Sequence, residues 1–162
     1  MKKYTAFALL AMTFMLSCKK TGVNCEENVN PEKLTSQQID AFIKKKFEAD
    51  HRFEWSSASD QIIWSALQES DRVLSVGFMP AGISAADIKL ETVDINDEKW
   101  MNAKKEVLNI ILTEEQKLNK NITLNDIIQW QENVLPVIDV NVSSFSTIQK
   151  LRACNLVRYA EP

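Results

Sequence analysis

The sequence predicts an α+β fold, because stretches with the two-residue period of strands alternate with stretches whose apolar residues recur at helical spacing. Strand-like alternation occupies residues 72–79, 126–131, 138–142 and 157–161, and helical spacing occupies residues 96–111 and 143–151. The order is therefore strand, helix, strand, strand, helix, strand. Two such split strand–helix–strand units form a four-stranded antiparallel sheet with both helices on one face, the ferredoxin-like βαββαβ arrangement. The opposite face stays open and can serve as a docking surface.

Two helices are expected before this sheet. Thr35 and Gln38 have the spacing of a capping box for the first helix, and Ser59 is suited to cap the second. The apolar stripes are Ile39, Phe42, Ile43 and Phe47 in the first helix and Ile62, Ile63, Ala66 and Leu67 in the second. Residues 34–71 therefore form a predicted N-terminal helical extension to a domain at 72–162.

The first half of that domain contains a strand, a long helix and a second strand. Apolar residues alternate with small or polar ones over 72–79, and Pro80 closes this strand. Asn96 can cap the helix, whose core stripe comprises Trp100, Ala103, Val107, Leu108 and Ile111. Ile128 and Trp130 alternate with glutamines, which predicts that both lie on one face of the second strand.

The second half begins with the alternation of Ile138, Val140 and Val142. Ser143 or Ser144 can cap the next helix, whose stripe comprises Phe145, Ile148 and Leu151. In the last strand, the two-residue period places Val157 and Tyr159 on one face and the intervening residues on the other.

The first residues have the features of an export signal. Lys2 and Lys3 precede an apolar run at 5–16, which is too short to span a bilayer as a helix. Met15-Leu16-Ser17-Cys18 resembles the bacterial lipoprotein processing box, in which the cysteine is acylated and becomes the new N-terminus. We expect a signal peptide at 1–17, lipid attachment at Cys18, and a flexible tether at 18–33 that anchors the domain to a membrane of the cell envelope, on the periplasmic side or at the cell surface. An ordinary secretory signal with an incidental cysteine is the alternative.

Charge and cysteine content narrow the choice of partner. Cleavage before Cys18 leaves 17 basic and 22 acidic residues, because Lys2 and Lys3 are the charged side chains that it removes. A chain with this excess of acidic residues is not expected to bind nucleic acid.

In an oxidising compartment Cys25 and Cys154 can either pair or remain two free thiols, and the sequence leaves both options open.

The C-terminal residues form a motif. Leu151-Arg152 is followed by Leu156-Val157-Arg158-Tyr159-Ala160-Glu161-Pro162, so that a leucine-rich helix runs into a strand of Val-x-Tyr-x-Glu type. This segment resembles the end of the propeptide of subtilisin-like serine peptidases. The block at 53–79, with Trp55 and Ile63-Trp64-Ser65-Ala66-Leu67, resembles the front of propeptides in exported bacterial members of that group.

The resemblance implies a folding chaperone and inhibitor of a peptidase. In that family the open sheet face packs on two surface helices of the catalytic domain, and propeptide carboxylates sit at the helix N-termini, where the dipole favours an anion. Glu161 is the acid expected in that role. Val157 and Tyr159 are expected to shape the docking strand, and family members continue beyond the equivalent of Pro162 into a tail that binds the active-site cleft. The expected partner is therefore the catalytic domain of a subtilisin-like serine peptidase.

The chain itself is not expected to be an enzyme. Hydrolysis by a Ser-His-Asp triad is excluded, because the single histidine, His51, lies in a polar loop and no serine is flanked by glycines. Two groups could contribute metal ligands, namely Glu48 with His51, and Asp94 with Asn96 and Glu98. Helix capping and solvation explain both groups, so no metal or cofactor is expected.

The four tryptophans raise the possibility of a carbohydrate platform. Trp100 and Trp130 fall on apolar stripes and are predicted to be core residues, which leaves Trp55 and Trp64 as the candidates for exposure. The competing functional hypothesis is a cell-envelope lipoprotein that binds a ligand, or assembles with its neighbours, through the same open sheet face.

Overall fold

The computed structural model of the chain describes residues 30–162. The predicted signal peptide at 1–17, the lipid attachment site Cys18 and the second cysteine, Cys25, lie outside the described residues. Within the described part, no helix combines the length and the apolar character needed to cross a bilayer.

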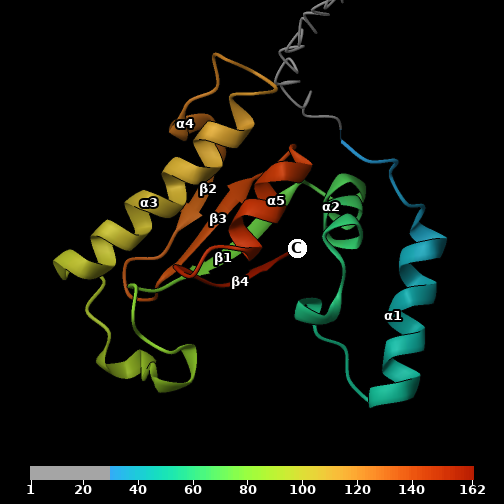
Figure 1. Ribbon diagram of the computed structural model, residues 1–162, viewed down its shortest axis with the longest axis horizontal. Coiled ribbons are helices and arrows are strands. Elements are labelled where there is room, and N and C mark those ends of the chain that lie inside the picture. Colours follow the sequence, from blue (N-terminus) through green and yellow to red (C-terminus); the bar gives the residue numbers. More distant parts are fainter. Residues whose placement is uncertain (1–29) are drawn as a thin grey trace, which may run out of the picture.

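A four-stranded antiparallel sheet forms the centre of the structure (Figure 1). Its strands are β1 (Val73–Phe78), β2 (Ile128–Gln131), β3 (Val137–Asn141) and β4 (Val157–Glu161), in the spatial order β2-β3-β1-β4. All three neighbouring pairs are antiparallel. The predicted α+β class with a four-stranded antiparallel sheet is therefore confirmed.

Five α-helices accompany the sheet in the described part of the chain. They are α1 (Ser36–Asp50), α2 (Asp60–Glu69), α3 (Glu98–Glu115), α4 (Leu124–Ile127) and α5 (Phe145–Arg152). Helices α3 and α5 lie across one face of the sheet, and α2 lies beside α5 (Figure 1). The short helix α4 leads directly into β2.

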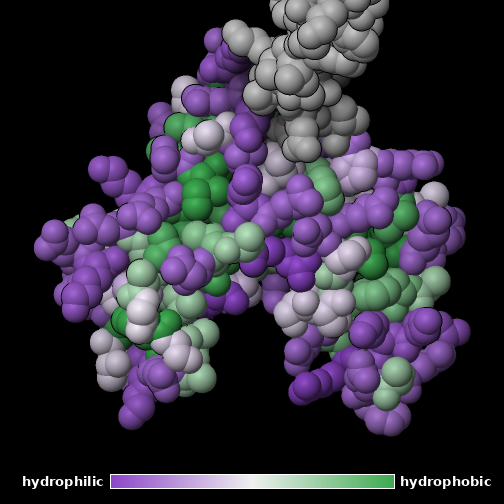
Figure 2. Space-filling model, in the orientation of Figure 1, coloured by the Kyte–Doolittle hydropathy of each residue, from purple (hydrophilic) through white to green (hydrophobic). Residues whose placement is uncertain are grey.

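The hydrophobic core lies between the sheet and these helices. Ile63 and Leu67 of α2 are fully buried in the same cluster as Val76 of β1 and Ile138 of β3. Helix α2 is thus part of the core of the sheet, while the domain boundary placed at residues 71 and 72 stays a prediction. Hydrophilic side chains cover the outward sides of α1 and α3 (Figure 2).

The helix caps agree with the sequence at three of four positions. At the start of α5 the N-cap residue is Ser144, one of the two predicted serines. Thr35 and Gln38 form the predicted capping box of α1, and Ser59 accepts the backbone N–H of Ile62 at the start of α2. The cap of α3 is Asp97 and not Asn96. Asp97 accepts the backbone N–H of Lys99 at 2.9 Å. The backbone N–H of Asn96 donates instead to the carboxylate of Asp94, so Asn96 belongs to the turn before the helix.

A bulge in β4 changes which side chains share a face. Tyr159 pairs with Gly77 whereas Val157 pairs with Phe78, so the register shifts and Arg158 is the extra residue. Phe78 faces the core, and Val157 packs against the core with it, while Tyr159 turns to the opposite face over Gly77. The prediction that Val157 and Tyr159 share a face is therefore wrong, because one extra residue reverses the alternation.

A second bulge has the same effect in β2. Ile128 pairs with Val140 and packs against the core, whereas Trp130 pairs with Asp139 and is 50 % exposed. The prediction that Trp130 is a core residue is wrong, because the register shifts between Ile128 and Trp130. The strand also begins at Ile128, two residues later than predicted, because α4 closes a helical turn first.

Trp64, a candidate for exposure in the sequence, is buried. Its side chain is 6 % exposed, its indole N–H donates to the carbonyl of Ser143 at 2.9 Å, and its ring packs edge-on against Phe145. Trp64 is buried because α2 packs on α5, and the periodicity of α2 alone could not predict this tertiary contact.

Candidate functional site

The sheet face opposite α3 and α5 is the candidate functional site, and we call it the open face. One row across its strands comprises Trp130, Asp139, Ser75 and Glu161, and the next row comprises Val137, Gly77 and Tyr159. Apart from the exposed Trp130 and the buried Gly77, these residues are half-buried. Their side chains are therefore reachable from solvent and are also held by their neighbours.

The ring of Tyr159, which the bulge turns to the open face, fits over β1 because residue 77 is a glycine. A Cβ atom at Gly77 would lie only 2.3 Å from Cε1 of Tyr159, well inside contact distance. The missing side chain on β1 thus makes room for the ring from β4. The guanidinium of Arg158 lies over the same ring, with its carbon 5.3 Å from the ring centre, in a cation–π contact.

Two carboxylates share one row of the open face. Asp139 on β3 and Glu161 on β4 are separated by the single strand β1, so their backbones are about 10 Å apart at the usual strand spacing. Neither acid forms an ion pair with another described residue. This separation is similar to the distance between two packed α-helices, which is about 8–10 Å.

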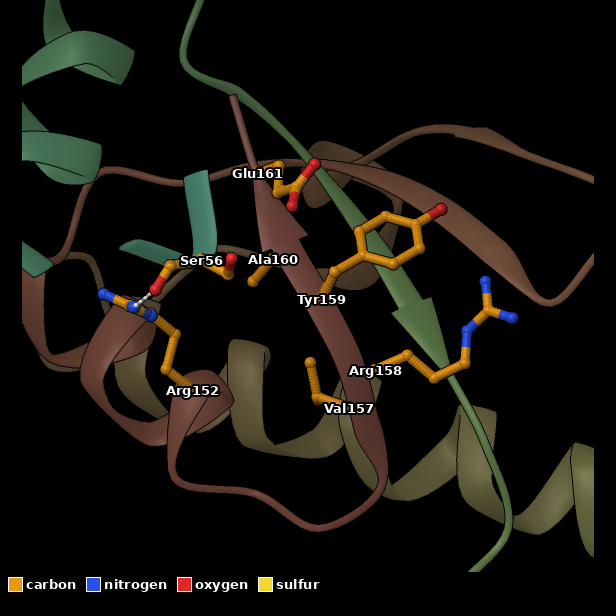
Figure 3. A pocket seen from close by; sticks show the side chains of 7 residues that line it. All are labelled: Ser56, Arg152, Val157, Arg158, Tyr159, Ala160 and Glu161. Atoms are coloured by element: carbon orange, nitrogen blue, oxygen red, sulfur yellow. Dashed lines mark hydrogen bonds between the residues drawn. The ribbon is translucent and has the colours of Figure 1, made fainter. Parts of the chain in front are cut away.

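The structure separates the residues that were predicted to form the docking strand. Tyr159 and Glu161 lie on the open face, whereas Val157 lies on the core side of β4. In Figure 3, Val157 points toward Arg152, while Tyr159 points to the other side of the strand. Pro162 follows β4 and is exposed. Trp130 belongs to the open face and was not predicted to lie there, because the bulge that turns it outward is not visible in the two-residue period. The alternation over β3 already places Asp139 on the face opposite Ile138 and Val140, but its place in one row with Glu161 depends on strand register.

A small pocket of about 120 Å³ lies beside β4 (Figure 3). Arg152 closes one side of it and donates to the carbonyl of Ser56 at 3.0 Å, to the carbonyl of Ala58 at 2.8 Å and to the carboxylate of Asp60 at 2.6 Å. The guanidinium thus holds the segment before α2 against α5. Arg158 also lines this pocket, and it lies over the ring of Tyr159. Both cations of the pocket are therefore engaged by the chain, and we interpret the pocket as a structural junction.

A buried polar cluster at the N-terminus of α5 was not predicted. Glu115 is 2 % exposed and accepts the backbone N–H groups of Ser143 and Ser144, both at 3.1 Å, and the hydroxyl of Thr147 at 2.6 Å. Backbone N–H groups at a helix start have no partner within the helix, so the carboxylate caps α5 from α3. The available signal was the position of Glu115, four residues after the core residue Ile111 and therefore on the same stripe of α3.

Glu114 contributes a second carboxylate to this cluster. It accepts the hydroxyl of Ser146 at 2.6 Å and the ammonium of Lys117. Burial by itself raises the pKa of Glu114, but the hydrogen bonds from Lys117 and Ser146 and the charges of Lys117 and Lys150 together lower it below its usual range. Glu114 is therefore ionised at neutral pH.

His51 and Asp94, from the two groups considered as metal ligands, have local structural roles. His51 caps the C-terminus of α1 in a left-handed conformation, with φ of 55°. Asp94 accepts the backbone N–H of Asn96. The described residues include no group of three or more His, Cys, Asp or Glu side chains that could hold a metal ion. Cys154 is half-buried and forms no disulfide with another described residue.

A scan against protein-family models, a search of curated proteins and a search of solved structures found no match to this chain.

Proposed function

We propose that this chain is an exported lipoprotein whose domain is ferredoxin-like and binds the catalytic domain of a subtilisin-like serine peptidase, as its folding chaperone and inhibitor. The element order β1-α3-β2-β3-α5-β4 and the sheet order β2-β3-β1-β4 support the ferredoxin-like description. The processing box ending at Cys18 supports export and lipid anchoring. The motif at 151–162 supports the choice of partner.

The observation that carries the proposal is the pair of acids on the open face. Asp139 and Glu161 lie in one row with one strand between them, which matches the distance between two packed helices. A carboxylate at a helix N-terminus satisfies unpaired N–H groups and interacts favourably with the dipole. A partner that presents two adjacent helix N-termini therefore complements this face in both spacing and charge.

The residues of β4 have different roles in this proposal. Glu161 contacts the partner directly, and Tyr159 packs beside it on the same face. Val157 acts from the core side, where it holds β4 in the sheet. The chain performs no chemistry of its own, and its effect on the peptidase comes from binding.

The test is the refolding of a denatured subtilisin-like peptidase domain from the same organism, with and without the full chain added in trans in mild detergent. Addition of the chain is expected to accelerate recovery of activity and then to inhibit the refolded enzyme when it is in excess. The proposal would be refuted if neither effect is seen and the chain does not bind the peptidase at micromolar concentrations, which correspond to weak but specific association. The alternative of an envelope lipoprotein that uses the open face for another ligand would then be favoured.

Charge-removing variants of matched size test the acid pair. The double variant Asp139→Asn with Glu161→Gln should bind the peptidase about tenfold more weakly, since each helix-terminal carboxylate contributes roughly 0.3–1 kcal/mol. Asp40→Asn is the control, because Asp40 is an exposed acid on α1, away from the sheet. Equal loss in the control would show that only net charge matters.

A further inference from the structure

We infer that Trp130 is the apolar anchor of the open face, and that its indole packs on the first turn of the partner helix whose N-terminus faces Asp139. The inference rests on the proposed function, because it assigns a contact within the same docking face. It adds a residue outside the C-terminal motif and on the opposite edge of the sheet.

Trp130 differs from the buried tryptophans of the chain. Trp64 and Trp100 are in the core, whereas half of the Trp130 surface is exposed to water. A tryptophan side chain can bury about 150–250 Å² in a contact, so Trp130 leaves on the order of 100 Å² of mostly apolar surface without cover. Val134 and Leu135, in the loop that follows β2, are also exposed and extend the apolar character of this hairpin.

The direction of Trp130 is built into the strand. Without the bulge in β2, Trp130 would share the core side with Ile128, and the register shift turns it to the open face instead. The next residue confirms the geometry, since the side chain of Gln131 accepts the ammonium of Lys104 on α3 at 2.7 Å, on the helix side of the sheet. The backbone N–H of Glu132 also donates to the carbonyl of Val137.

Trp130 lies on a hydrogen-bonded strand, so its backbone loses little conformational freedom when a partner covers the side chain. Such preorganised aromatic side chains are typical anchors of interfaces. Trp130 is the cross-strand neighbour of Asp139, so the indole and the carboxylate reach the same element of a partner. The carboxylate favours the N–H groups and dipole of a helix N-terminus, while the indole packs on the aliphatic side chains of the first turn. This charge complementarity selects a helix N-terminus as the occupant.

The experiment titrates the same refolded peptidase domain with the full chain and with two variants, Trp130→Ala and Phe47→Ala. Trp130→Ala should weaken binding about 30-fold or more, as expected for a buried tryptophan anchor. Phe47→Ala is the matched control, because Phe47 is an exposed aromatic residue on α1 and should leave affinity within about twofold. Thermal unfolding of both variants verifies that they are folded.

Footprinting of the unmodified chain with hydroxyl radicals keeps the inference falsifiable if Trp130→Ala does not fold. In the complex, oxidation of Trp130 should fall several-fold, while oxidation of Phe47 should not change. Two results would overturn the role of Trp130 as an anchor, provided that the wild-type chain binds normally: an undiminished affinity of Trp130→Ala, or a Trp130 that is still oxidised in the complex. Either result would leave the proposed function unchanged. Failure of the wild-type chain to bind would overturn both.

Discussion

The replacement Glu115→Gln is expected to destabilise the fold by about 2 kcal/mol, although it changes neither size nor shape. One carboxylate oxygen accepts the N–H of Ser144 and the hydroxyl of Thr147, and the other accepts the N–H of Ser143. A glutamine has one oxygen, so its amide NH₂ must face at least one of these donors. The variant thus loses a charge-assisted hydrogen bond, which contributes about 1.5–3 kcal/mol, and leaves a buried N–H without an acceptor.

Two further variants divide this effect into its parts. Thr147→Val removes only the hydroxyl donor and should reduce the free energy of unfolding by about 1 kcal/mol. Glu115→Ala removes all three hydrogen bonds and creates a cavity, so it should cost about 4 kcal/mol or more. The expected order of stability is therefore wild type, Thr147→Val, Glu115→Gln and Glu115→Ala.

Equilibrium unfolding in urea, followed by tryptophan fluorescence, measures these differences. Glu106→Gln is the control, because Glu106 is an exposed acid on the same helix and should change stability by less than about 0.5 kcal/mol. A Glu115→Gln variant as stable as this control would refute the reasoning, since it would show that the carboxylate does not stabilise the start of α5.

Three other predictions concern the sheet, the junction with α2 and the pH dependence. Gly77→Ala should lower the free energy of unfolding in urea by about 1–3 kcal/mol, because the new methyl group displaces the ring of Tyr159. Most of this loss should disappear when Tyr159 is also replaced by alanine. An equal loss with and without the Tyr159 ring would contradict the packing argument. Arg152→Met should speed proteolysis between residues 52 and 60, since it removes the three hydrogen bonds that the guanidinium donates to this segment. Arg152→Lys should restore only part of the protection, because an ammonium group lacks the planar fork of donors. The lowered pKa of Glu114 stabilises the fold above about pH 4.3, where the unfolded side chain is ionised, and this stabilisation is lost as the pH falls through the lower folded-state pKa. The difference in unfolding free energy between wild type and Glu114→Gln should therefore shrink on acidification. A constant difference from pH 6 to pH 3 would contradict this role of the Glu114 carboxylate.

The α+β class, the four strands and the two helices of the sheet domain could be predicted from the sequence, because they depend on local periodicity. Alternation over β1 and β3 identifies their core side chains correctly, since both strands are central and regular. The stripe of α3 from Trp100 to Ile111 is likewise buried as predicted. Local capping grammar also located the starts of α1 and α2.

The composition of the open face was decided by tertiary structure. A bulge in each edge strand reverses the alternation, so Trp130 and Tyr159 lie on the face opposite to Ile128 and Val157, and no residue of either strand marks the extra position. Strand order placed Asp139 in one row with Glu161 although 21 residues lie between them in the chain. Burial of Glu115 likewise required α3 and α5 to pack together, because its hydrogen-bond donors come from residues about 30 positions away.

The sequence by itself determined the elements and the core face of the central strands, since these follow from local periodicity. Which side chains share the open face was settled by pairing between strands distant in the chain, since register and bulges exist only once those strands are hydrogen-bonded.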